Sequence, residues 1–155
     1  MTSFVVNDPT EAEIRYVVMN LREKSREDLF TTLDATPKEF ADALVMSPGL
    51  KWAIYCDNRP AVLMTADQVH KGVWSVYGMG TDDWIKVWRR VTSFGKRDMI
   101  PAILDAGGHR GHTVSPAWHE DTHKWLRYMG FNHEAPMPKY GPNGEDYILF
   151  SWLKE

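Results

Sequence analysis

The apolar pattern of the chain changes its period near residue 50. Before that point, apolar residues such as Ile14, Val17 and Leu21 recur three and four positions apart, a spacing that places them on one face of a helix. After that point, short β-type runs are separated by clusters of turn residues. A chain that combines both patterns is expected to adopt an α/β fold, which excludes a pure helical bundle and an all-β sandwich.

The N-terminal third is predicted to contain one short strand and three helices. Thr10 is followed three residues later by Glu13, the pattern of a capping box at a helix start. Thr36 is followed by Pro37, and proline is favoured at the first helical position. The expected elements are a strand at 4–6 and helices at 10–21, 26–33 and 36–46.

The rest of the chain alternates between strands and helices. Turn residues at 57–60 predict a hairpin, Pro101 predicts a kink or a fresh helical turn, and Gly130 predicts a helix end. The expected strands are 51–55, 61–65, 73–77, 112–114, 131–137 and 146–153, with one helix opening at Thr81 and another at 118–129. No repeat or linker interrupts this order, so a single domain over residues 1–155 is expected.

Composition limits the classes of partner and the compartment. The net charge of −3 gives no strong signal for nucleic-acid binding. Cys56 is the only cysteine, so no intramolecular disulfide is possible and a reducing compartment is expected. The N-terminus lacks a basic segment followed by an apolar one, and no apolar run approaches the roughly 18 residues of a membrane span. These features predict a cytoplasmic protein without a signal peptide.

The C-terminal third contains a predicted helix that ends in a Gly-Phe pair and leads into a further strand. The segment His119–Phe131 is similar to the helix of GNAT acetyltransferases that often reads Asn-x-x-Ala-x-x-Leu-Tyr-x-x-x-Gly-Phe, and Gly130 and Phe131 keep its ending. Together with the order of the elements, this segment resembles the GNAT fold. The resemblance implies a mixed, twisted sheet flanked by helices on both faces.

A second resemblance covers nearly the whole chain. Its residues, in chain order, are Asn20–Arg22, Trp74, Gly80–Asp82, Lys124–Phe131, Pro136–Pro138, Tyr140, Gly141, Gly144 and Phe150. Their order and spacing are similar to a family of phage-encoded GNAT-like proteins that includes the internal virion protein A of short-tailed coliphages. The resemblance implies other phage or host proteins as partners, and a location in the host cytoplasm or in the virion.

GNAT enzymes bind the pyrophosphate of acetyl-CoA on backbone N–H groups of a loop that follows the central strand, usually Gln/Arg-x-x-Gly-x-Gly/Ala. A helix N-terminus suits an anion because its first N–H groups have no partner within the helix. By resemblance, the residues at this position are Gly78, Met79, Gly80 and Thr81. They are the candidate cofactor-binding residues if acetyl-CoA binds.

This stretch departs from the enzyme pattern in two ways. The Gln/Arg-x-x-Gly-x-Gly/Ala spacing is absent, and Asp82 and Asp83 add negative charge beside the phosphate position. One interpretation is a decayed site with no cofactor, in which Thr81 or Asp82 only caps the next helix. The other is an atypical loop that still binds acetyl-CoA.

No residue is assigned as the catalytic acid or base. By resemblance, the acid that protonates the leaving thiolate would stand at Leu126, which has no proton to donate. Tyr128 follows two positions later, on a different face of the helix. His119, Glu120 and His123 are available as bases, but nothing in the sequence places them beside an acceptor.

His119, Glu120 and His123 also match the H-E-x-x-H pattern of zinc proteases. Histidines at i and i+4 share a helix face and can both ligate Zn²⁺, while the glutamate activates water. A third ligand is required, and Glu145 or Asp146 could provide it only if the chain folds back. A zinc hydrolase is therefore an alternative, and no metal ligand is assigned.

Taken together, these features favour a phage-type GNAT-like protein with a degenerate acetyl-CoA site that acts through protein contacts, in the virion or in its assembly. The alternative is an active acetyl-CoA-dependent N-acyltransferase. The first hypothesis expects no cofactor, and the second expects acetyl-CoA.

Overall fold

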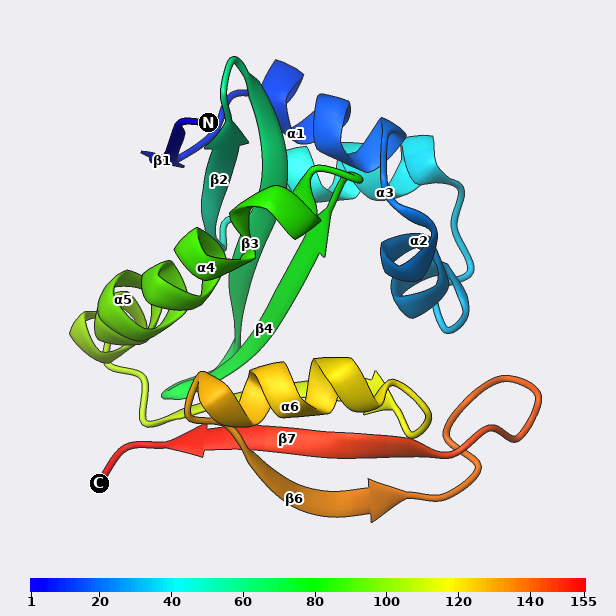
Figure 1. Ribbon diagram of the computed structural model, residues 1–155. Coiled ribbons are helices and arrows are strands. Elements are labelled where there is room, and N and C mark those ends of the chain that lie inside the picture. The colour runs from blue at the N-terminus through cyan, green and yellow to red at the C-terminus, as the bar shows by residue number, and fades with distance from the viewer. The chain divides into compact units, whose positions relative to one another are not determined.

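The computed structural model describes residues 1–155 and confirms the α/β class (Figure 1). Its seven-stranded sheet has the strand order β1-β2-β3-β4-β5-β7-β6. The strands are β1 Ser3–Asn7, β2 Leu50–Cys56, β3 Arg59–His70, β4 Val73–Gly80, β5 Arg110–Pro116, β6 Asn132–Met137 and β7 Tyr147–Leu153. The helices are α1 Glu11–Met19, α2 Glu23–Phe30, α3 Pro37–Met46, α4 Trp84–Phe94, the π-helical turn η1 Gly95–Met99, α5 Ile100–Asp105 and α6 Glu120–Tyr128.

The chain divides into two compact units. Unit 1 comprises residues 1–67 and 77–91, and unit 2 comprises residues 68–76 and 92–155. β3, β4 and α4 each begin in one unit and end in the other. Each unit is described separately below.

In unit 1, helices cover both faces of the strands. Antiparallel pairing joins β1 to β2 and β2 to β3. The core on one face combines α1–α3 with the strands, and its buried members are Ile14, Val17, Val18, Leu21, Leu29, Ala41, Leu44, Ala53, Leu63 and Met79. On the opposite face of β4, Gly78 and Gly80 lie against the indole of Trp84 in α4. Complete burial of each large aliphatic side chain contributes about 1.5–3 kcal/mol, so this core stabilises the unit strongly.

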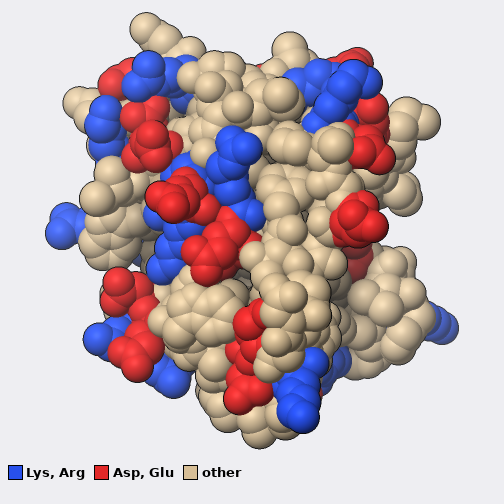
Figure 2. Space-filling view, turned by 90° about the vertical axis from the view of Figure 1, so that its right-hand side faces the viewer, with Lys and Arg blue, Asp and Glu red and all other residues tan.

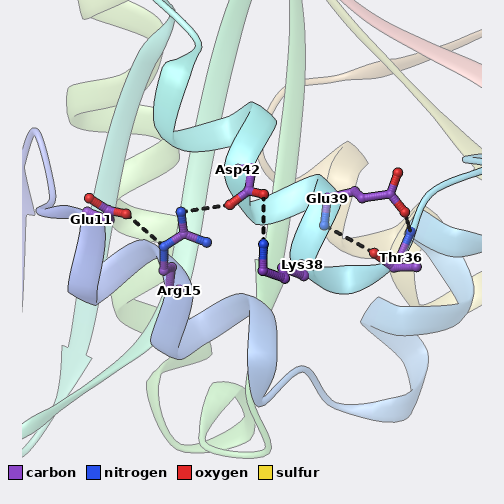
Figure 3. Close-up of polar contacts among 6 residues, drawn as sticks. All are labelled: Glu11, Arg15, Thr36, Lys38, Glu39 and Asp42. Atoms are coloured by element: carbon purple, nitrogen blue, oxygen red, sulfur yellow. Dashed lines mark hydrogen bonds and ion pairs between the residues drawn. The ribbon is translucent and has the colours of Figure 1, made fainter.

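Two capping boxes fix the starts of α1 and α3. The sequence predicted the box at Thr10, whereas at Thr36 it predicted a helix start only from Pro37. The Thr36 hydroxyl accepts the Glu39 N–H at 3.2 Å, and the Glu39 carboxylate accepts the Thr36 N–H at 3.2 Å (Figure 3). Thr10 and Glu13 form the same reciprocal pair. The close-up also shows that Arg15 of α1 reaches Asp42 of α3, with 2.7 Å between Nη2 and Oδ1.

Several elements differ in length from the sequence expectation. β4 continues to Gly80 rather than ending at Tyr77, and the next helix begins at Trp84 rather than at Thr81. Strand pairing in β2 and β3 resumes at Arg59, so the hairpin turn is shorter than 57–60. Pro101 lies in the first turn of α5, directly after the π-helical turn, which confirms the fresh helical turn that the sequence offered as one of two possibilities.

In unit 2, β7 is the central strand of an antiparallel sheet. It pairs with β5 on one side and with β6 on the other, and β5 pairs in parallel with β4 at 73–75. The β6 ladder is irregular between His133 and Ala135, and Pro136 follows directly. Phe150 of β7 is fully buried and its ring lies 5.1 Å from that of His123 in α6. α6 itself starts at Glu120, so the expected helix at 118–129 is shorter, and Trp118 is 50% exposed.

A polar cluster ties the three C-terminal strands together. Arg110 of β5 makes a two-pronged ion pair with Glu134 of β6, at 2.6 and 3.0 Å. Ser151 of β7, between them, donates to the same carboxylate at 2.6 Å. The Arg110 guanidinium is the main cause that lowers the pKa of Glu134 to about 2.

The surface carries charges of both signs. On the face drawn in Figure 2, Lys and Arg side chains lie among Asp and Glu side chains, which agrees with the small net charge of −3. None of the helices has the length and apolar character required to cross a membrane.

The Thr36 capping box gives a first stability prediction. Thr36→Ala is expected to lower the free energy of unfolding by about 1 kcal/mol, because the Glu39 N–H loses its acceptor. Thr36→Ser keeps the hydroxyl and is expected to stay close to the wild type. Urea denaturation of the three proteins checks this, and equal losses in both variants would contradict it.

The Glu134 cluster gives a prediction about pH. A carboxyl whose pKa is lowered in the folded state stabilises the protein above its unfolded-state pKa of about 4.3 and loses that contribution as the pH falls towards the folded-state value. Because the folded-state pKa of Glu134 is about 2, Glu134→Gln should reduce the unfolding free energy at neutral pH. The difference in unfolding free energy between this variant and the wild type, called the gap below, should narrow as the pH falls from about 5 to about 2.

Urea titrations at several pH values measure this gap, with Glu155→Gln at the exposed C-terminus as the matched control. A gap that stays constant over this pH range would show that the ionised Glu134 does not contribute to stability.

Candidate functional site

The connection from β4 to α4 is short. Only residues 81–83 separate the end of β4 from the start of α4. Of the candidate cofactor-binding residues, Gly78, Met79 and Gly80 lie within β4, and Thr81 is the first residue after it. The Met79 side chain is 1% exposed and belongs to the core of unit 1. Sequence reasoning therefore placed a loop where the chain is mostly strand.

Four backbone N–H groups in and beside this connection have acceptors inside the protein. Their bonds are Gly80 to Ser25 Oγ at 3.2 Å, Thr81 to the Ala61 carbonyl at 2.8 Å, Asp83 to Thr81 Oγ1 at 3.2 Å and Trp84 to the Thr81 carbonyl at 3.0 Å. The Thr81 hydroxyl accepts the N–H of Asp83, which precedes α4, so it stabilises the turn at 81–83 and does not cap the helix itself. N–H groups engaged in this way are not available to an anion at the N-terminus of α4.

Both backbone groups of Gly80 form hydrogen bonds with the start of α2. Its carbonyl accepts the Arg22 N–H at 2.9 Å, and its own N–H is donated to Ser25. The Arg22 guanidinium lies over the Trp84 ring, 4.7 Å from its centroid, and burial lowers the pKa of Arg22. A Cβ on residue 80 would lie 2.6 Å from a Trp84 ring atom and 3.0 Å from the Ala61 carbonyl, so this close packing requires glycine.

The two aspartates of the connection are not equivalent. Asp83 is 8% exposed and pairs with Arg59 at 2.6 Å and with Lys86 at 3.2 Å. The hydrogen bond from Arg59 is the main cause that keeps the pKa of Asp83 below its ordinary value. Asp82 is exposed. The negative charge of Asp83 is therefore balanced by two cations, a compensation that the sequence does not reveal.

A small hollow borders this connection. Its volume is about 170 Å³, and its lining residues are Tyr16, Asn20, Arg59, Thr81, Asp82 and Asp83. One guanidinium and two carboxylates therefore face the hollow, and the guanidinium is already paired with Asp83. This balance favours water or a neutral polar group over a pyrophosphate.

A second cavity of unit 1, named here the α2–α3 cavity, lies between these two helices and the strands β3 and β4. Its volume is about 170 Å³, and its lining residues are Asp28, Leu29, Thr32, Leu33, Phe40, Leu44, Thr65, Asp67, Tyr77 and Met79. The sequence analysis did not identify this cavity, because its residues come from four elements and form no linear motif.

Leu126, the position that the resemblance gives to the catalytic acid, is apolar and buried. Leu126 is 5% exposed and packs in the interior of unit 2. Tyr128 is 67% exposed, and its ring lies 4.9 Å from the Lys96 ammonium group. Neither residue lies in the two hollows of unit 1, so no catalytic acid is assigned.

The histidines of the H-E-x-x-H pattern are both buried, at 7% exposed for His119 and 5% for His123. The His123 Nε2 atom lies 2.9 Å from the Pro116 carbonyl and 3.1 Å from Ser115 Oγ. Because a carbonyl only accepts, Nε2 carries the proton and has no lone pair for a metal. No group of three or more His, Cys, Asp or Glu residues that could hold a metal ion is present.

Comparisons with known proteins bear on the fold. Neither a protein-family model nor a curated protein sequence matches the chain. The structure is similar to Ard1 from Thermoplasma volcanium, with TM-score 0.77, 8% identity and coverage of 100% of this chain and 99% of that one.

Two further solved structures support the same conclusion. The ribosomal-protein-S18-alanine N-acetyltransferase from Escherichia coli matches with TM-score 0.70 and 14% identity, over 99% of this chain and 96% of that one. An acetyltransferase of the GNAT family from Streptococcus pneumoniae matches with TM-score 0.69 and 16% identity, over 99% of this chain and 100% of that one. From end to end, the chain therefore has the fold of the GNAT acetyltransferases.

Proposed function

We propose that residues 1–155 form a single GNAT-fold domain whose acetyl-CoA site has decayed and which acts through contacts with other proteins. The observation that carries this proposal is the set of hydrogen bonds donated inside the protein by the N–H groups of residues 80, 81, 83 and 84. A phosphate at a helix N-terminus is bound by such groups. To accept one, this connection would have to break bonds that hold β4, α2 and α4 together.

The length of the connection supports the same proposal. The enzyme pattern Gln/Arg-x-x-Gly-x-Gly/Ala occupies six positions, whereas three residues lie between β4 and α4. Arg59, the cation that lines the hollow beside this connection, is paired with Asp83 at 2.6 Å. The exposed carboxylate of Asp82 adds negative charge that repels an incoming phosphate.

The mode of action is inferred from the sequence resemblance and from α4. The resemblance of residues such as Asn20–Arg22 and Lys124–Phe131 to phage-encoded GNAT-like proteins supports a role in the virion or its assembly. On α4, Ile85 is 73% exposed and Trp88 42% exposed, and the neighbouring Arg89 is exposed as well. Aromatic and arginine side chains are enriched where proteins bind one another. The expected partners are phage or host proteins in the host cytoplasm or the virion.

An active N-acyltransferase is the second candidate. It is favoured by the match to N-acetyltransferase structures over nearly the whole chain, and by the α2–α3 cavity, which offers space for a small acceptor. Under this alternative, acetyl-CoA would bind at Gly78, Met79, Gly80 and Thr81.

Calorimetric titration with acetyl-CoA separates the two candidates. The decayed site predicts no heat of binding up to a concentration of about 1 mM, which corresponds to a binding free energy weaker than about −4 kcal/mol. Asp82→Asn is expected to give the same result, because the N–H groups remain engaged after the charge is removed.

Acetyl-pantetheine serves as the control ligand without the nucleotide. Micromolar binding that requires the nucleotide would contradict the proposal and favour the acyltransferase. If only Asp82→Asn binds acetyl-CoA, the negative charge of Asp82, and not the hydrogen-bonded backbone N–H groups, prevents binding in the wild type.

A further inference from the structure

β1 is the first strand in the sheet order, so one of its edges has no strand beside it (Figure 1). Its sequence, Ser-Phe-Val-Val-Asn, contains neither a proline nor a charged residue, and its pairing with β2 shows no register shift. Exposed strand edges are usually blocked by a charged side chain, a proline or a bulge. β1 has none of these, so its open edge is regular and suited to a further strand.

Two hydrogen bonds at the ends of the β1–β2 ladder show which backbone groups face the open edge. The Asp57 N–H donates to the Thr2 carbonyl at 2.7 Å. The Asp8 N–H donates to the Lys51 carbonyl at 3.2 Å. In an antiparallel ladder, hydrogen-bonded pairs alternate with pairs whose backbone groups point away from each other, so the even-numbered residues of β1 bond to β2. The residues that direct their N–H and C=O groups to the open edge are Ser3, Val5 and Asn7.

Phe4 places an ordered aromatic ring beside this edge. It is 40% exposed, and its ring stacks on that of Tyr55 with 4.6 Å between the centroids. Tyr55 is itself held, because its hydroxyl donates to the Glu13 carboxylate at 2.6 Å. Val6 lies on the same face of the sheet as Phe4 and packs against the core of unit 1. A neighbouring strand therefore meets side chains that are already fixed in place, which lowers the entropic cost of binding.

A second copy of β1 fits this edge if the two strands run antiparallel about a two-fold axis at Val5. Val5 then lies opposite Val5 of the other copy, and Ser3 lies opposite Asn7. In this register every N–H and C=O group at the open edge gains a partner. Phe4 of each copy lies opposite Val6 of the other, and pairs of an aromatic with a β-branched residue are favourable across strands. Because the strand contains no charged residue, no like charges meet.

We propose that β1 is an interaction surface for a second copy of this chain, and that the two β1 strands pair about Val5 to form one continuous sheet. Both copies use the same surface, as a two-fold interface requires, so the contact closes at two copies. The strand has five residues, so the interface is small and the dimer is weak and reversible. The contact does not involve the connection at 81–83, so it is independent of whether acetyl-CoA binds.

Sedimentation equilibrium combined with amide hydrogen exchange tests the wild-type protein. A dimer is expected to form as the protein concentration rises from about 1 μM to about 1 mM. Over the same range, exchange of the Ser3, Val5 and Asn7 amides should slow, because their N–H groups become hydrogen-bonded. The Phe4 and Val6 amides already bond to β2 and should change less. A monomer at all concentrations, or exchange of the first three amides that does not depend on concentration, would overturn the proposal.

Val5→Pro removes one outward N–H group from each copy and leaves the hydrogen bonds to β2 in place, and an edge strand tolerates proline at such a position. It is expected to weaken dimerisation at least about tenfold. Val5→Ile keeps the N–H group and the β-branched side chain, so it is the matched control and should dimerise as the wild type does. Circular dichroism checks that both variants are folded. A folded Val5→Pro variant that dimerises as strongly as the wild type would refute pairing through β1.

Phe4→Ala tests the side-chain contact while every backbone group is kept. It is expected to weaken dimerisation about fivefold, because the ring opposite Val6 of the other copy is lost. Tyr128→Ala removes another exposed aromatic ring, on α6, and is the matched control that should dimerise as the wild type does. Equal weakening in both variants would rule out a specific role of Phe4 at the interface.

Discussion

The hydrogen bonds around Gly80 organise much of unit 1. The start of α2 binds both backbone groups of this residue, and Trp84 of α4 packs so closely against it that a side chain would not fit. A single position thus connects two helices on opposite faces to the end of a central strand. Because Arg22 also lies over the Trp84 ring, backbone and side-chain contacts reinforce each other. The same contacts hold the chain together at the position where the sequence resemblance places the cofactor loop.

Under the proposed loss of the cofactor site, this closure explains how the fold can be retained. The strand order, the helix positions and the core depend on apolar packing and ladder hydrogen bonds, and none of these requires acetyl-CoA. The pair between Asp83 and Arg59 illustrates the point, because it satisfies locally a charge that would otherwise repel a phosphate. Fold and chemistry are therefore separate properties of this chain.

The sequence was sufficient for features that depend on local pattern. The capping box at Thr10, the helix start at Thr36 and Pro37, the helices that follow and the α/β class were predicted correctly. The extension of β4 to Gly80 was not predicted. In the sequence, a glycine in an unpaired segment cannot be distinguished from a glycine in a strand until the neighbouring strand is placed. The compensation of Asp83 by Arg59 and the α2–α3 cavity depend on residues far apart in the chain, which no spacing reveals.

The irregular end of the sheet at β6 has a consequence for the protein at high concentration. β6 is the last strand in the order, so one of its edges has no partner within the sheet, and such edges invite strands of other molecules to pair with them. The irregularity between His133 and Ala135 interrupts the ladder, and Pro136 directly after it has no N–H to donate. This edge is therefore a poor template for intermolecular sheets, and the protein is protected there against aggregation by strand addition.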